Sequence, residues 1–273
     1  MYISKINNKK ETLLPLPHKT PLTIKVLFFY SPETLKSYVN KEQLIADIDD
    51  FCFILADILN HNIMKYKTTV TKVANIEFKD MQQGKEVLSC SEIRSLTTNY
   101  PKGVYPHLMQ LQVAYKANLV VFLPMVKDGN LFFGNAAVLG FTTPYEACLS
   151  LGRGRELKNK KTSECFPTLL PHEFGHILGC SHALTDGEQA DSKRVPAYGH
   201  IVEDEFGETL YGTMMASIRP RKHIFYYSNP NLFCYPFPVQ NTACGKLGIS
   251  ENYKIVEANL PRLAATFNDE IFV

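Results

Sequence analysis

Eleven residues, HEFGHILGCSH at 172–182, restrict the fold of this chain more than any other stretch. His172 and His176 are four positions apart, so on an α-helix their side chains project from one face. Two imidazoles placed in this way can both reach one cation at the roughly 2.0–2.1 Å that zinc requires. Gly179 permits the positive φ that ends a helix, so the chain can turn there and bring back His182 as a third ligand. The stretch therefore predicts a helix, a turn and a zinc site.

The residues around the histidines are typical of a helix that begins just before them. Leu170, Phe174 and Ile177 form an apolar stripe on the opposite face. Pro171 is tolerated only in the first turn, where its missing N–H would have no helical partner. Glu173 follows the first histidine directly, and its carboxylate can reach a metal-bound water rather than the metal. Glu173 is therefore the candidate general base.

Alternating strand and helix patterns precede the motif. The predicted strands are residues 22–30, 68–78, 118–124 and 131–141, which are rich in β-branched and aromatic residues. Apolar residues at helical spacing predict two helices, at about 40–58 and 104–117. The first begins with Asn40 and Gln43, which have the spacing of a capping box. This alternation predicts an α/β fold with a mostly parallel sheet.

The rest of the chain is expected to be less regular. A polar loop is expected before the second helix, and Gly134 suggests a bulge or a close backbone approach in the last predicted strand. Beyond residue 141 the strand signals fade, so we expect the motif helix, long loops and a terminal helix that begins near Ser250. Residues 1–21 are polar and then interrupted by prolines, which predicts a flexible leader. Residues 22–273 suit a single domain.

The charge balance excludes several classes of partner. With 29 basic and 27 acidic residues, the net charge of +2 indicates no surface for nucleic acid or for an anionic membrane. No stretch approaches the roughly 18 consecutive apolar residues of a membrane span. The N-terminal residues also lack the apolar segment of a secretory signal peptide.

The chain has seven cysteines, so at least one is unpaired if disulfides form within it. Two pairs, Cys148 with Cys165 and Cys234 with Cys244, are close enough in sequence to be bridged. Spacing alone does not establish a bridge. Cys52 falls on the apolar face of a predicted helix and is expected to be a small buried hydrophobic residue.

The motif carries a resemblance to a known family. H-E-x-x-H-x-x-G-x-x-H is the signature of the metzincin zinc endopeptidases. GTMMAS (212–217) resembles the methionine turn beneath the zinc of that family, with Met215 at the position of the turn methionine. IKVLFFYSPE resembles the opening strand of reprolysin-like bacterial peptidases, including the peptidyl-Asp metalloendopeptidase group. AYGH (197–200) and YYSNPN (226–231) resemble that group's segments around the turn.

The resemblance covers about residues 22–267, with two departures. Ala183 stands where many reprolysin-like enzymes have an aspartate. Ser217 stands where some metzincins have a tyrosine that helps to stabilise the oxyanion, so no tyrosine role is carried over. These departures leave the subfamily, and hence the cleavage preference, open.

The resemblance implies an α/β fold of the zincin-like α+β type. It would have a mostly parallel twisted sheet with an antiparallel edge strand, and two long helices including the zinc-binding helix. A loop-rich C-terminal lobe would contain the Met-turn and the terminal helix. The upper lobe would extend to about residue 179 and the lower lobe over 180–273, with an extended peptide in the cleft between them.

The resemblance also implies a zinc-dependent endopeptidase with one catalytic zinc ion. The implied zinc ligands are His172, His176 and His182. Zinc would polarise the scissile carbonyl and lower the pKa of its water to roughly 7. Glu173 would take the proton of that water and deliver it to the leaving amine. Met215 would pack under the imidazoles as an apolar floor.

We further expect an edge strand beside the cleft, to which a substrate peptide adds by main-chain hydrogen bonds. Its residues are Phe133, Gly134, Asn135, Ala136, Ala137 and Val138. The alternative is an ordinary edge strand. We expect a monomer whose partners are protein or peptide substrates. Relatives of this kind are mostly secreted, so we expect secretion or delivery outside the producing cell, with a cytoplasmic location as the alternative.

Two other functions compete with this interpretation. EACLS (146–150) followed by HEFGH resembles peptide deformylases, in which Cys148 would be a metal ligand in place of His182. However, Leu139 stands where that family has a glutamine, and the Met-turn would have no role. A zinc-stabilised binding module without catalysis is the third hypothesis. Three protein ligands leave one position open, which is typical of catalytic rather than structural zinc.

Overall fold

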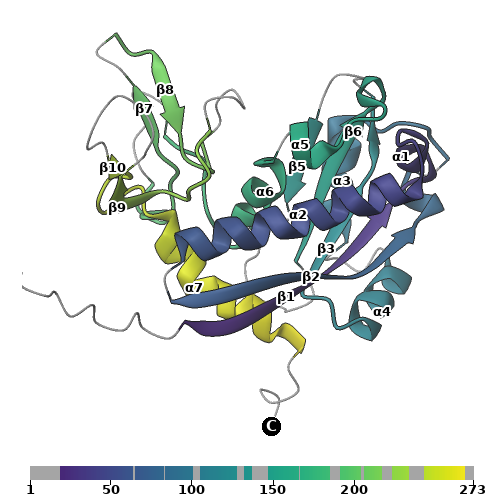
Figure 1. The fold of residues 1–273 in the computed structure, drawn as a ribbon, viewed down its shortest axis with the longest axis horizontal. Coiled ribbons are helices and arrows are strands. Elements are labelled where there is room, and N and C mark those ends of the chain that lie inside the picture. The colour runs from purple at the N-terminus through teal and green to yellow at the C-terminus, as the bar shows by residue number, and fades with distance from the viewer. Residues whose placement is uncertain are drawn as a thin grey trace, which may run out of the picture.

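A mixed sheet of six strands forms the centre of the fold (Figure 1). The computed structural model describes residues 19–63, 65–82, 84–100, 105–127, 132–136, 147–165, 167–184, 191–203, 206–216, 223–233 and 243–267. The strands of the sheet are β1 (Thr20–Tyr30), β2 (Tyr66–Glu77), β3 (Leu119–Leu123), β4 (Met125–Val126), β5 (Phe132–Ala136) and β6 (Cys148–Gly154).

The sheet is parallel except at one edge. β1 lies between β2 and β3, β6 lies beside β3, and all of these pairs are parallel. β4 also pairs in parallel with β6, farther along the strand. β5 pairs antiparallel with the other side of β6, where Asn135 is opposite Ser150, and it pairs with no other described strand. The predicted α/β fold with a mostly parallel sheet and an antiparallel edge strand is confirmed.

Helices cover both faces of the sheet. They are α1 (Pro32–Lys36), α2 (Lys41–Asn62), α3 (Cys90–Asn99), α4 (Pro106–Ala114), α5 (Thr162–Cys165), α6 (Leu169–Ile177) and α7 (Asn252–Ala264), with 3₁₀ turns at Lys79–Gln82, Arg155–Leu157 and Ala265–Phe267. α2, which lies across the strands in Figure 1, packs with α6 and α7 against Val26 and Phe28 of β1. α3 and α4 pack on the other face with Leu27 and Phe29. This alternation is that of a strand buried on both faces.

The helices agree with the sequence patterns in most places. The Asn40 side chain accepts a hydrogen bond from the Gln43 N–H at 2.8 Å, as expected for the start of α2. α4 and α7 lie within the predicted helical regions. α3 contradicts the polar loop expected before the second helix. A capping box of Ser89 and Glu92 begins α3, so a local helix signal is present in the sequence.

Strand β6 is a second correction, because no strand was expected after residue 141. Its sequence, CLSLGRG, contains two glycines, which are depleted in strands. All of its residues are nevertheless buried, and strands on both sides supply its hydrogen bonds. Pairing with strands that are distant in sequence, rather than local propensity, therefore forms β6.

The buried Arg153 of β6 belongs to a polar cluster that holds the segment before the motif helix. Its guanidinium lies 4.1 Å from the ring centre of Tyr38, and its Nη1 lies 3.2 Å from Thr162 Oγ1. Asp47 of α2 accepts hydrogen bonds from the backbone N–H groups of Thr162 and Ser163 at 2.9 and 2.8 Å. Buried charges are tolerated when they are paired and hydrogen-bonded in this way. The cluster ties α5, which directly precedes α6, to α2.

The chain after α6 contains little regular structure before the terminal helix. Two small antiparallel pairs lie beyond the end of α6 in Figure 1: β7 (Ile201–Glu203) with β8 (Thr209–Gly212), and β9 (Asn229–Phe233) with β10 (Ala243–Cys244). The described segments between them are loops and turns, and α7 follows as the predicted terminal helix. Among the described helices, none combines the length and the apolar character needed to cross a membrane.

The cysteines differ in part from the expectation. Cys148 is buried and forms no disulfide, so the bridge considered between Cys148 and Cys165 is not formed. Cys244 is disulfide-bonded, and its partner lies outside the described side chains. Cys52 is free and buried, as predicted from its position on the apolar face of α2.

Candidate metal centre

The motif helix α6 begins where the sequence predicted. It starts at Leu169, so Pro171 lies in the first turn, where no helical hydrogen bond is lost. Leu170, Phe174 and Ile177 are almost fully buried and face the core that α2 shares. This buried stripe turns the opposite face of α6, which carries the two helical histidines, away from the sheet. The helix has nine residues, so α2 is the longer helix by far.

The end of α6 is a Schellman turn. Gly179 has a φ of +95°, as predicted, and the Cys180 N–H donates to the Gly175 carbonyl at 2.9 Å. The Asn259 side chain of α7 donates to the Leu178 carbonyl at 2.8 Å, which satisfies one of the last helical acceptors. The turn is therefore held by α7 as well as by its own backbone, and it directs the following residues back towards the helix.

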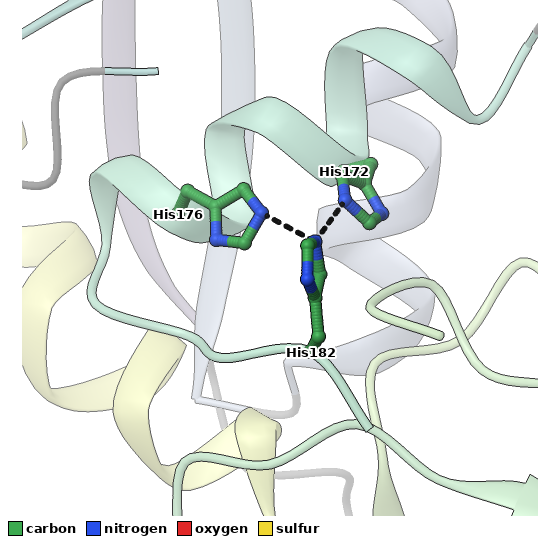
Figure 2. Close-up of side chains that lie close together, drawn as sticks. All are labelled: His172, His176 and His182. Carbon is green, nitrogen blue, oxygen red and sulfur yellow. Dashed lines mark hydrogen bonds between the residues drawn. The ribbon is translucent and has the colours of Figure 1, made fainter. Parts of the chain in front are cut away.

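The three histidines of the motif come together at one point (Figure 2). The Nε2 atom of His182 lies 3.1 Å from Nε2 of His172 and 3.0 Å from Nε2 of His176. Figure 2 shows the helical pair on α6 and His182 reaching between them from the following segment. One ligand atom from each ring lies within 4.8 Å of the others, so this group can hold a metal ion.

The other nitrogens of the helical pair are held by backbone carbonyls. His172 Nδ1 lies 2.7 Å from the Met214 carbonyl, and His176 Nδ1 lies 2.9 Å from the Cys180 carbonyl. Because a carbonyl only accepts, each Nδ1 donates and each Nε2 keeps a free lone pair. Two ligands of one tetrahedral ion at 2.0–2.1 Å are about 3.3 Å apart, close to the spacing seen here. The donor set therefore fits a divalent transition metal such as zinc.

Burial keeps these rings neutral. It lowers the pKa of His172 to about 3, with a further contribution from His176. It lowers the pKa of His176 to about 4, with a further contribution from His182, whose own pKa is also lowered by burial. Neutral imidazole is the form that binds metals, so the metal-free site is already in the ligating state at neutral pH.

The Glu173 side chain projects from α6 towards the edge strand β5. Its side chain is buried, and this burial raises the pKa of its carboxyl to about 8. A Cβ atom placed on Gly134 would collide with the Glu173 carboxylate and would lie 2.6 Å from Cγ and Cδ. The predicted close approach at Gly134 is therefore the contact with Glu173. A carboxyl that titrates near neutral pH is suited to accepting and returning a proton.

Met214 and Met215 contact both the motif helix α6 and the segment that carries His182. Met214 supplies the carbonyl that holds His172, and the Met215 carbonyl accepts from the N–H of Ala183, next to His182, at 3.2 Å. The Met215 side chain is fully buried and packs at Gly175, where an added Cβ would collide with its sulfur and lie 3.3 Å from its methyl carbon. Met215 thus contacts α6 between the two helical histidines.

We expect Met215→Leu to be a mild change. Leucine is similar in volume and apolar, so it can fill the same space against Gly175 at a cost of less than about 1.5 kcal/mol. Zinc content by metal analysis and the free energy of unfolding should stay close to those of the unsubstituted protein. A folded Met215→Leu protein that has lost its zinc would show that the sulfur does more than pack.

Tyr227 supports the site, and no role was assigned to it from the sequence although it lies in the YYSNPN segment. Its hydroxyl donates to the Pro171 carbonyl at 2.6 Å, and its N–H donates to the Asn62 side chain at 2.8 Å. Its neighbour Tyr226 accepts from the Met214 N–H at 2.7 Å. The segment therefore links the end of α2, the first turn of α6 and Met214. No local pattern around Tyr227 carries this information, since each partner is distant in sequence.

The alternative ligand Cys148 lies away from the histidines. It belongs to the core beneath α3 and α4, and its Sγ donates to the Thr97 carbonyl at 3.4 Å. The described metal-ligating group contains His182 and not Cys148, so the deformylase-like ligand set is not formed. Phe133–Ala136 lie in β5, as expected for the edge strand, whereas Ala137 and Val138 lie outside the described residues.

Comparison with known proteins is informative about the fold alone. No family model and no curated protein matches the chain. A solved structure described as a chaperone-substrate complex matches with a TM-score of 0.63 and 15% identity, over 90% of this chain and 36% of that chain. Metalloproteinase-II from Bacteroides fragilis matches with a TM-score of 0.36 and 14% identity, over 63% of this chain and 47% of that chain. The chain thus spans less than half the length of either solved chain.

Proposed function

We propose that this protein is a zinc-dependent endopeptidase. The observation that carries the proposal is the convergence of three imidazole Nε2 atoms, two of them oriented by carbonyls at Nδ1, in a motif whose glutamate is buried. The spacing of the motif and its resemblance to metzincins support the same conclusion. The described ligand set has three members, which leaves a position for water or substrate, as in catalytic zinc sites.

His172, His176 and His182 would hold the zinc ion, and each residue has a defined task. When bound, zinc would act as a Lewis acid on the scissile carbonyl and would lower the pKa of a water in its open position. Glu173 would accept a proton from that water and deliver it to the leaving amine. Glu173 follows the first proposed ligand directly in the sequence, and its carboxylate packs against Gly134 of β5.

The edge strand β5 is the proposed binding strand for the substrate. It pairs with β6 on one side, and among the described residues no strand pairs with its other side. α6 packs beside it, so a peptide added to this edge would pass close to Glu173. The substrate is accordingly an extended segment of a protein or peptide. We also propose that the protein acts outside the cell that makes it, as most enzymes with this motif do.

The test is cleavage of an unfolded protein by the zinc-loaded protein, with and without a chelator. We expect cleavage that the chelator abolishes and added zinc restores, and the cleavage sites can be identified by mass spectrometry of the products. A protein with one equivalent of zinc that cleaves no unfolded substrate would contradict the proposal. That result would favour a zinc-stabilised binding module.

A further inference from the structure

Gly134 is needed for space and not for backbone conformation. It lies in the middle of β5, where a glycine weakens a strand because it has no side chain to pack. Gly134 is not among the described glycines with positive φ, so its backbone would accept an L-residue. What excludes a side chain is Glu173, since an added Cβ would lie 2.6 Å from Cγ and Cδ and would collide with the carboxylate.

Glu173 has little room to move away from such a side chain. Only 6% of the residue is exposed, and it lies in a helix whose neighbouring positions are fixed. His172 is held by the Met214 carbonyl, and Phe174 is fully buried in the core. A collision at Gly134 would therefore turn the carboxylate out of its place or push β5 away from α6.

The opposite face of β5 is held by a hydrogen bond to α3. Successive residues of a strand point to opposite faces, so Asn135 points away from Glu173. The Asn135 side chain donates a hydrogen bond to Thr97 Oγ1 of α3, and this hydroxyl in turn donates to the Arg94 carbonyl at 2.9 Å. Thr97 is fully buried. β5 thus lies between α3 and Glu173, and a shift of β5 away from Glu173 would strain the partly buried hydrogen bond between Asn135 and Thr97.

We propose that Gly134 is a positioning residue for Glu173. Its missing side chain, on a strand that Asn135 links to α3, leaves the space that the Glu173 carboxylate occupies against β5. The functional part of this inference rests on the proposed role of Glu173 as general base, whereas the steric part does not. The two parts are tested by different measurements.

The steric part is tested by thermal unfolding of the metal-free protein. Gly134→Ala, Glu173→Ala and the double variant form a cycle in which Glu173→Ala removes the three atoms nearest to an added Cβ at 134. Overpacking in a domain of this size lowers the Tm by about 2–12 °C, and we expect Gly134→Ala to do so. In the Glu173→Ala background the same substitution should lower the Tm by far less, because the collision is absent.

The matched control uses a carboxylate far from the strand. Glu77 is exposed at the end of β2, so Gly134→Ala combined with Glu77→Ala should change the Tm additively. Equal effects of Gly134→Ala in the Glu173 and Glu173→Ala backgrounds would overturn the proposal.

The functional part is tested by steady-state kinetics and metal analysis. Gly134→Ala should keep one equivalent of zinc and lose about 100-fold in kcat, the scale expected when a reacting group is displaced by about 1 Å. Glu173→Asp, which shortens the side chain, should lose less activity in the Gly134→Ala background than in the unsubstituted protein. Additive losses would overturn the positioning role. If the unsubstituted protein cleaves nothing, the proposed function fails, and the Tm cycle still decides whether Gly134 positions Glu173.

Discussion

Glu173→Gln is expected to lower the rate of peptide cleavage by about 10²–10⁴-fold while the protein keeps its zinc and its fold. The amide has nearly the shape of the carboxyl, so it can occupy the same buried space against Gly134. It cannot take up a proton from water, so the step assigned to the carboxylate is lost. Activity on an unfolded protein, zinc content and the Tm should be measured on one preparation.

The control for this prediction is Glu77→Gln, which changes an exposed carboxylate at the end of β2. It should leave activity within about twofold, because surface substitutions away from a site change little. Near-normal cleavage by zinc-loaded Glu173→Gln would refute the role of Glu173 as general base. It would leave the metal site itself in place.

His182→Ala is expected to lose most of its zinc and all of its peptidase activity. His182 is the proposed ligand whose Nε2 lies within 3.1 Å of the Nε2 atoms of both helical histidines. Removing one of three protein ligands leaves two nitrogens, which hold zinc far more weakly. Metal analysis after dialysis, alongside the cleavage assay, measures both effects.

Two further variants test whether the loss of zinc is specific to His182. Cys148→Ala should keep one equivalent of zinc and cleave protein substrates, because its thiol lies under α3 and donates to the Thr97 carbonyl. Its stability should fall by about 1 kcal/mol, as for many core changes. His61→Ala removes an exposed histidine of α2 and should change neither zinc nor activity. Full zinc in His182→Ala with loss of zinc in Cys148→Ala would overturn the assigned ligand set.

Features built from near neighbours were readable in the sequence. The start of α2 at Asn40, Pro171 in the first turn of α6 and the positive φ of Gly179 each depend on contacts within about five residues. The capping box that starts α3 was equally local, and the polar composition of the segment concealed it. Local rules describe such features because the interacting groups are brought together by the helix or turn itself.

Strand β6 could not be predicted from local sequence patterns. Its glycines disfavour a strand, and its buried Arg153 reads as a surface residue. Both are accommodated by distant partners: β3 and β5 supply the backbone pairing, while Tyr38 and Asp47 surround the guanidinium. The free energy that makes this segment a strand therefore comes from tertiary contacts.

The sequence by itself determined which residue types meet at the candidate site, since the spacing of His172, His176 and His182 around a helix and a glycine turn allows few other arrangements. Only the tertiary structure decided how the side chains of these residues are oriented. The carbonyl that orients His172 comes from Met214, 42 residues away, and the strand position that confines Glu173 is Gly134. Imidazole tautomers and carboxyl placement depend on packing between separate elements, and no local periodicity encodes such packing.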